Sequence, residues 1–198
     1  MDIAAYLNAI TGLFVIIDPI GAALIFHSLV PESEKRHRKV MAFKSVTISV
    51  VLLMVFGNYG EPLLHQLGIS IEALRISGGL LLFYTAFNMI TKDEEYETVD
   101  KTRDISVFPM SIPLLAGPGS LTLSILLFSN ATTWQSELSV AAAILSVSAI
   151  TLGLMLAAKY LKKIIGRTGD EILQRFLGVL LAALSIQFIY DGIINLVP

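Results

Sequence analysis

The chain has 198 residues, of which 55% are hydrophobic and 15% charged, and its mean hydropathy is +0.74. Soluble domains carry about 25% charged residues, so this composition excludes an ordinary soluble domain and predicts an integral membrane protein. A net charge of −2 gives no reason to expect nucleic-acid binding. The chain has no cysteine and only three histidines without metal-ligand spacing, so we expect no disulfide, no metal site and no cofactor.

Six apolar segments are long enough to cross a membrane as helices. About 20 apolar residues span the hydrocarbon core, and the segments that qualify are roughly 4–30, 40–58, 70–90, 107–129, 138–159 and 172–196. The first segment lacks a basic start and is too long for a signal peptide, so we expect it to remain as a helix. The sequence therefore predicts an all-α membrane protein with six transmembrane helices.

Basic residues gather in alternate connections between these segments. The first, third and fifth connections hold 13 of the 14 lysines and arginines, and only Arg75 lies elsewhere. Connections rich in Lys and Arg stay on the cytoplasmic side of a membrane. The predicted topology therefore has both termini on the outer face.

The first segment is interrupted near its middle by Asp18-Pro19-Ile20-Gly21. Proline cannot donate a backbone hydrogen bond, and it disfavours helical geometry at the preceding residue. An ionised Asp and unsatisfied backbone groups are costly in hydrocarbon, so the interruption must face a protein-lined cavity or a partner helix. We expect two half-helices that meet near mid-membrane, with a free amino end that suits a carboxylate.

A second interruption, Ala116-Gly117-Pro118-Gly119-Ser120, lies in the middle of the fourth segment. Its proline follows Pro19 by 99 positions, and a motif at 75–81 recurs in related form at 175–181. Three spans per half is an odd number, so the second half must enter the membrane inverted, as in many secondary transporters. The predicted organisation, with the first and fourth helices broken at mid-membrane, is a first three-helix repeat (1–90), a charged cytoplasmic linker (91–106) and a second, inverted three-helix repeat (107–198).

Asp18 is the only acid near the middle of a span, and its chemistry leaves three roles open. It can cap the second half-helix, hold a substrate ammonium, or carry a coupling proton. The cap is the plainest role, but it does not exclude the others, because a cap can be uncovered in one state of a cycle. In the second interruption, Ser120 is placed as a helix cap or as a ligand hydroxyl.

Other spans carry polar residues at helical spacing. We take four of them as second-tier candidates for lining the site: Tyr84, Asn88, Ser124 and Gln187. The competing interpretation is hydrogen bonding between helices, which is common in membranes. For the stripe of Gln187, Asp191 and Asn195 on the sixth span, that interpretation is favoured.

The two interruptions, with Arg75-Ile76-Ser77-Gly78-Gly79-Leu80-Leu81 between them, resemble the MarC family of bacterial and archaeal inner-membrane proteins. The resemblance covers essentially the whole chain. It implies a transporter of neutral amino acids in the prokaryotic inner (plasma) membrane, built as an inverted repeat of three spans. It also implies that the substrate lies between the two broken helices, on Asp18, Pro19, Gly21, Gly117, Pro118, Gly119 and Ser120.

The residues themselves lead to the same substrate class. Two half-helix amino ends can hold a carboxylate and Asp18 can hold an ammonium, which is the pattern of a zwitterion. No second fixed charge lies at mid-depth, so small neutral amino acids follow as a hypothesis. We expect an exporter or exchanger that works by alternating access, coupled to protons through Asp18, with Na⁺ held by unwound carbonyls as the alternative.

Three other functions compete with transport by alternating access. The first is a channel or pore for a small solute or ion, and the second is a non-transport structural protein of the membrane. The third is an intramembrane enzyme, but Tyr190-Asp191 lacks a Gly-x-Gly-Asp partner, and neither a His-Glu-x-x-His nor a Gly-x-Ser-x-Gly motif is present. We therefore do not expect an enzyme, and the sequence does not specify the oligomeric state.

Overall fold

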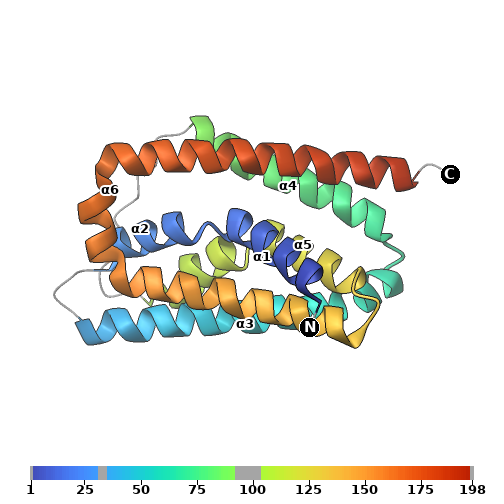
Figure 1. Ribbon diagram of the computed structural model, residues 1–198, viewed down its shortest axis with the longest axis horizontal. Coiled ribbons are helices and arrows are strands. Elements are labelled where there is room, and N and C mark those ends of the chain that lie inside the picture. Colours follow the sequence, from blue (N-terminus) through green and yellow to red (C-terminus); the bar gives the residue numbers. More distant parts are fainter. Residues whose placement is uncertain (1, 31–34, 92–103, 197–198) are drawn as a thin grey trace.

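The computed structural model describes residues 2–30, 35–91 and 104–196, and these residues are helical apart from short connections. Most of the predicted linker 91–106 lies outside the described residues. The elements are α1 (Ile3–Ile17), α2 (Pro19–Leu29), α3 (Lys35–Gln66), α4 (Ile71–Thr91), the irregular helix η1 (Ser106–Leu115), α5 (Pro118–Ser129) and α6 (Trp134–Leu196) (Figure 1).

Among the described residues, five helices are long and apolar enough to cross a membrane, and the bent pair of η1 and α5 forms a sixth if it counts as one span. A helix satisfies its own backbone hydrogen bonds, which is what a lipid environment requires. The predicted all-helical, multi-pass character is thereby confirmed, whereas the inverted repeat stays a prediction. The five helices are Ile3–His27, Arg36–Gln66, Ile71–Thr91, Trp134–Leu161 and Glu171–Leu196.

Two helices extend beyond their predicted bounds. α3 has 32 residues and includes basic residues that we expected in a connection. α6 has 63 residues and stays helical through the predicted connection between the fifth and sixth spans, where it reverses direction (Figure 1). That connection contains no proline and is rich in good helix formers, so its charge marks the end of an apolar span without ending the helix. We call 134–161 the first limb of α6 and 171–196 its second limb.

Glycines allow α4 and the second limb of α6 to pack closely along their length (Figure 1). A Cβ on Gly79 would lie 2.8 Å from the carbonyl oxygen of Ser185, and a Cβ on Gly178 would lie 3.3 Å from that of Ala86. Small residues permit such backbone approach in membrane helices. The two helices therefore form a firm pair on one side of the molecule.

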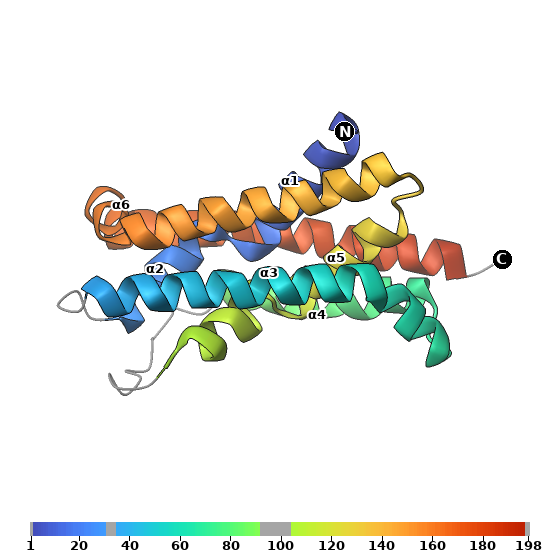
Figure 2. The same ribbon diagram turned by 90° about the horizontal axis from the view of Figure 1, so that it is seen from below.

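Each interrupted helix packs against a long continuous one. α1 and α2 contact the first limb of α6, where Tyr6 Oη lies 3.0 Å from Ser146 Oγ. η1 and α5 contact α3, where Ser124 Oγ donates to the carbonyl of Leu53 at 2.8 Å. In the view of Figure 2, α3 and the first limb of α6 lie apart, and α2 is visible between them. The main core, which includes Phe26, joins all of these elements.

Candidate functional site

The first interruption is a single residue, Asp18, between α1 and α2. Its backbone is left-handed (φ 45°, ψ 73°), a conformation that aspartate tolerates better than most residues. Its N–H donates to the carbonyl of Phe14 at 3.1 Å, and its Oδ1 accepts from the N–H of Gly21 at 3.0 Å. Pro19 follows at the first position of α2, where a missing N–H leaves no bond unmade. One residue thus ends α1 and caps α2.

Gly21 makes room for this cap. A Cβ on Gly21 would lie 2.2 Å from Oδ2 of Asp18, so a side chain there would displace the carboxylate. α1 and most of α2 still form one candidate span, Ile3–His27. The first interruption therefore places a carboxylate within a candidate span.

The second interruption comprises Ala116 and Gly117, between η1 and α5, and the chain bends there by 56°. Two prolines inside η1 remove backbone donors, and two residues of η1 have extended rather than helical dihedral angles. A Cβ on Gly117 would lie 2.2 Å from the carbonyl oxygen of Pro113. The bend therefore depends on a glycine that is closely enclosed by backbone.

Ser120 joins the two sides of this bend. Its hydroxyl is buried. The hydroxyl proton is shared between the carbonyl oxygens of Leu115, at 2.9 Å, and Gly117, at 3.1 Å. The predicted role as a side-chain cap is therefore wrong, since a cap accepts from an N–H. The amino end of α5 has no side-chain cap, because its N-cap residue is Gly117.

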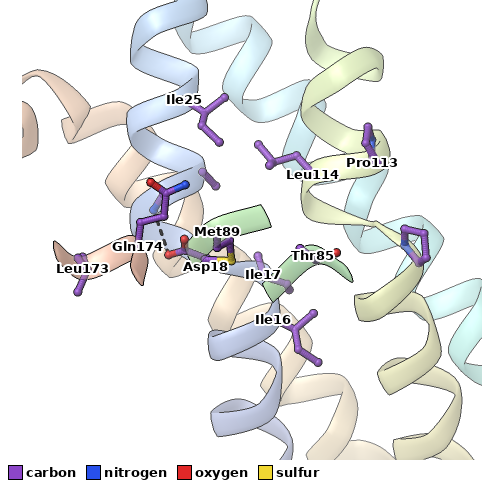
Figure 3. A pocket seen from close by; sticks show the side chains of 13 residues that line it. Ile16, Ile17, Asp18, Ile25, Thr85, Met89, Pro113, Leu114, Leu173 and Gln174 are labelled. Atoms are coloured by element: carbon purple, nitrogen blue, oxygen red, sulfur yellow. Dashed lines mark hydrogen bonds between the residues drawn. The ribbon is translucent and has the colours of Figure 1, made fainter. Parts of the chain in front are cut away.

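A cavity of about 260 Å³ lies between the two interruptions (Figure 3). Its lining includes Asp18 of the first interruption and Pro118, which directly follows the second, together with Thr85 of α4 and Gln174 of α6. Among the described residues of the lining, Asp18 is the only charged one, and most of the others are apolar. Within the parts of the chain that the structure describes, no three His, Asp or Glu side chains gather as a metal-binding group.

Some of the predicted site residues line the cavity and others lie outside its lining. Asp18, Gly21 and Pro118 line the cavity. Pro19, Gly117 and Ser120 are buried outside the lining, and Gly119 is half-buried where a Cβ would meet Leu82 at 2.2 Å. The first three residues can therefore touch a bound molecule, while the last four shape the two interruptions.

The face of α4 that lines the cavity differs from the predicted one. Tyr84 is 62% exposed and Asn88 is half-buried, and neither belongs to the lining. Thr85 and Met89, each one residue later, do belong to it. One residue is about 100° around a helix, so the polar stripe pointed to the wrong face. The buried Leu82 is three residues from Thr85 and seven from Met89, so it shares their face of α4. Residues that face lipid are apolar as well, so this periodicity gives only a weak signal for that face.

The remaining second-tier candidates form local contacts. The hydroxyl of Ser124 is used in the bond to α3 described above. Gln187 donates to Asp191 Oδ1 at 2.7 Å, and Asn195 donates to the carbonyl of Asp191 at 2.7 Å, all within α6. These bonds lie within one helix, in contrast to the predicted bonds between helices. Gln174, which does line the cavity, is next to Arg175 of the repeated motif but had no other signal in the sequence.

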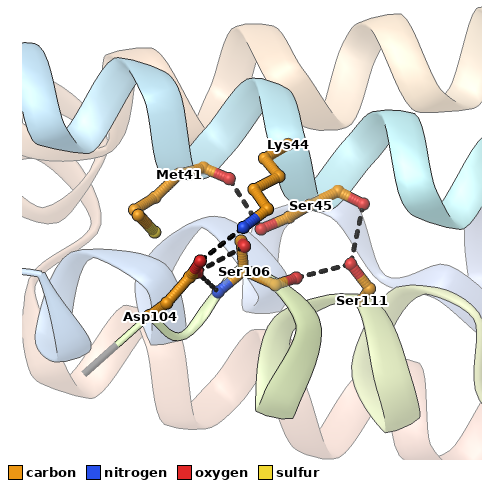
Figure 4. A network of polar contacts seen from close by, with 6 residues as sticks. All are labelled: Met41, Lys44, Ser45, Asp104, Ser106 and Ser111. Atoms are coloured by element: carbon orange, nitrogen blue, oxygen red, sulfur yellow. Dashed lines mark hydrogen bonds and ion pairs between the residues drawn. The ribbon is translucent and has the colours of Figure 1, made fainter.

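A polar network holds the start of η1 to α3 (Figure 4). Asp104 forms an ion pair with Lys44 and accepts from the N–H of Ser106 at 2.9 Å. The hydrogen bond from Lys44, followed by those from Ser106, lowers the pKa of Asp104 to about 2. Further along η1, Ser111 Oγ donates to the carbonyl of Ser45 at 3.0 Å. The approach to the second interruption is therefore anchored to a continuous helix.

The fold and composition define the chain as a multi-pass integral membrane protein. Comparison with known proteins identifies its family. The model of the family described as MarC family integral membrane protein matches residues 3–197. A UPF0056 membrane protein of Methanocaldococcus jannaschii is 33% identical, covering 98% of each chain. Another, of Archaeoglobus fulgidus, is 34% identical over 98% of this chain and 96% of its own.

A third relative, a UPF0056 membrane protein of Aquifex aeolicus, is 31% identical over 96% of this chain and 93% of its own. No solved structure matches the chain. The chain belongs to the MarC family of integral membrane proteins, as its two interruptions and the motif between them indicated.

Proposed function

We propose that the protein is a secondary transporter, an exporter or exchanger, of small neutral amino acids. The observation that carries the proposal is the cavity shared by both interruptions, with one carboxylate in a mostly apolar lining. Its volume of about 260 Å³ is below the roughly 300–1,000 Å³ of sites for drug-sized ligands. A small molecule with one charged group that pairs with Asp18 suits such a cavity.

The charges around the cavity favour a zwitterion. Asp18 offers a carboxylate to an ammonium group, and the amino end of α5 offers uncapped N–H groups and the positive end of a helix dipole to a carboxylate. Both Asp18 and Pro118, the first residue of α5, reach the lining. The described lining offers no second charged partner to a substrate with a charged side chain, so neutral side chains are favoured.

The packing of the helices supports the inverted repeat that alternating access requires. The first interrupted helix packs on the first limb of α6, and the second packs on α3, so each half supplies the support for the other. Polar contacts accompany both packings: Tyr6 contacts Ser146, and Ser111 contacts Ser45. Rocking of one half against the other around Asp18 would open the cavity to either side in turn.

Two further parts of the proposal follow from charge. Asp18 is the candidate carrier of a coupling proton, and Na⁺ coordinated by backbone carbonyls is the alternative driver. The basic connections favour an orientation with both termini outside. The location in the prokaryotic inner membrane is the one that the resemblance to the MarC family implies. The competing functions are a pore and a structural protein, which the following experiment separates from a transporter.

The test is uptake of labelled glycine, alanine, serine and threonine into proteoliposomes, with and without a pH gradient. Asn at position 18 accepts the same cap bond and tolerates the same backbone conformation as Asp. Asp18→Asn therefore removes the charge and keeps the helix start. We expect saturable uptake with counterflow in the wild type and a loss of about tenfold or more in the variant, as when a charge-assisted hydrogen bond is lost.

Asp191→Asn is the matched control, because it removes a carboxylate from the second limb of α6, away from the cavity lining. Its uptake should equal that of the wild type. Flux without saturation or counterflow would favour a pore. Uptake that survives Asp18→Asn would restrict Asp18 to its role as a cap, and no uptake of any of the four amino acids would contradict the proposed substrate class.

A further inference from the structure

A second cavity, of about 230 Å³, lies where α2 ends, α3 begins and the first limb of α6 approaches its reversal. Figure 1 shows these three places at the same end of the molecule. Arg38 and Lys39 of α3 and Lys159 of α6 are among the described residues that line the cavity. Three cations from two helices thus converge on one hollow.

The same cavity has an apolar interior and an apolar rim. Phe26 and Met155 line it and are completely buried. Leu156 and Tyr160 also line it, but they are 42% and 69% exposed. The hollow therefore continues outward onto an apolar surface, and a ligand that fills it needs both an anionic and an apolar part.

The cavity lies at the boundary of the apolar spans. One candidate span ends at His27, the next begins at Arg36, and the span of the first limb ends at Leu161. Tyrosine, lysine and arginine are enriched at this depth, where their apolar stems lie in lipid and their polar ends reach the headgroups. A ligand in the cavity would therefore sit at the level of lipid phosphates.

Contacts with neighbouring residues fix the position of Arg38. Its guanidinium carbon is 5.6 Å from the centre of the Phe26 ring, and Nη1 is 3.3 Å from the carbonyl oxygen of Val30. A guanidinium presents several donors in a fixed plane, which suits phosphate oxygens.

We propose that this cavity binds the headgroup phosphate of an anionic phospholipid, with an acyl chain along Leu156 and Tyr160. Basic pockets between membrane helices recognise lipid headgroups in this way. Free phosphate shares the headgroup chemistry, but it would leave the apolar rim uncovered. The proposal is independent of the transport function and rests on a different cavity.

The experiment measures lipid binding to the full-length protein in detergent, by native mass spectrometry and by the shift in thermal unfolding temperature. The probes are phosphatidylglycerol, phosphatidylcholine and inorganic phosphate. We expect phosphatidylglycerol to bind in preference to phosphatidylcholine and to raise the unfolding temperature. The double variant Lys39→Gln/Lys159→Gln should weaken phosphatidylglycerol binding by about tenfold or more, since each basic residue near a lipid phosphate contributes a few-fold.

Arg36→Gln/Lys163→Gln is the matched control, because both residues are exposed on α3 and α6 but lie outside the cavity lining, and the charge change is the same. It should alter binding by less than about threefold. The charge-preserving variant Lys39→Arg/Lys159→Arg should retain binding, which separates charge from folding. Equal losses in both glutamine variants, no preference for phosphatidylglycerol, or an equal temperature shift with inorganic phosphate alone would each overturn the lipid assignment.

Discussion

The two interruptions look alike in the sequence, since each places a proline within two residues of a glycine in the middle of an apolar run, yet they are built differently. The first is one left-handed residue whose own carboxylate caps the next helix. The second is a bend of 56° whose following helix has no side-chain cap. The first interruption thus brings its own anion, and the second leaves a helix end that an anion from outside can occupy. For the proposed zwitterionic substrate, this difference sets one orientation in the cavity, with the ammonium group at Asp18 and the carboxylate at the amino end of α5.

The largest expected effect on stability comes from replacing the glycine of each interruption, Gly117 and Gly21. A Cβ at Gly117 would strike the backbone oxygen of Pro113, while a Cβ at Gly21 would strike only the carboxylate of Asp18, in both cases at 2.2 Å. Backbone moves less readily than a side chain, so Gly117→Ala should lower the free energy of unfolding by about 3 kcal/mol. Gly21→Ala should cost about 1 kcal/mol through the lost cap.

Denaturant titration of the two purified variants in detergent measures both values. Gly153→Ala is a suitable control, because a Cβ there would have no atom within 4 Å and alanine favours helix. Equal losses at positions 21 and 117 would mean that the second bend is no more tightly enclosed than the first.

Removing the cap at Asp18 is expected to have the next largest effect. Asp18→Ala removes the acceptor for the Gly21 N–H and leaves an alanine in a left-handed conformation. The lost cap and the unfavourable backbone should together lower the free energy of unfolding by about 2 kcal/mol. Asp18→Asn should change it by less than about 0.5 kcal/mol, because Asn caps as well as Asp. Thermal unfolding of both variants checks this, and an equally unstable Asn variant would show that the charge itself is needed for folding.

These positions also show what could be predicted from the sequence. Proline, glycine and aspartate act on the backbone within a few residues, so Asp18 and Gly117 marked both interruptions without any knowledge of the fold. The face of α4 that lines the cavity could not be placed in this way. Lipid and protein interior are both apolar, so hydrophobic periodicity barely separates Tyr84, which faces outward, from Thr85, which faces the cavity.

Local sequence signals also predicted the ends of the helices only in part. Charged residues at the predicted fifth connection correctly marked the limits of the apolar spans, but helix propensity there is high and α6 continues through it. Gln174 reaches the cavity only because α6 reverses and its second limb returns along α4. A contact that depends on a turn of the whole chain has no local signal.

A smaller effect is expected at Ser120. Its hydroxyl donates to carbonyls at the second interruption, whereas the carboxylate of Asp18 accepts from an N–H at the first. Ser120→Ala removes the donor for two carbonyls and should cost about 1 kcal/mol of unfolding free energy. Ser77→Ala is the control, since that exposed hydroxyl bonds only to the Leu74 carbonyl in its own helix, and it should cost little. A Ser120→Ala protein as stable as wild type would mean that the bend is held by Gly117 and the prolines alone.

The smallest expected effect concerns the ion pair of Lys44 and Asp104, which anchors the start of η1. Lys44 and Asp104 are 44% and 45% exposed, so solvent screens their ion pair and Asp104→Asn should cost about 0.5 kcal/mol at pH 7. The pKa of Asp104 is lowered to about 2 from 3.8. The ion pair therefore stabilises the fold above about pH 4, and this contribution is lost as the pH falls toward 2. Thermal unfolding of wild type and variant should thus differ at pH 7 and converge near pH 2. A difference that persists at pH 2 would mean that the Asp104 side chain anchors η1 by its shape and neutral hydrogen bonds, and that the charge of the pair contributes nothing to holding the second interruption against α3.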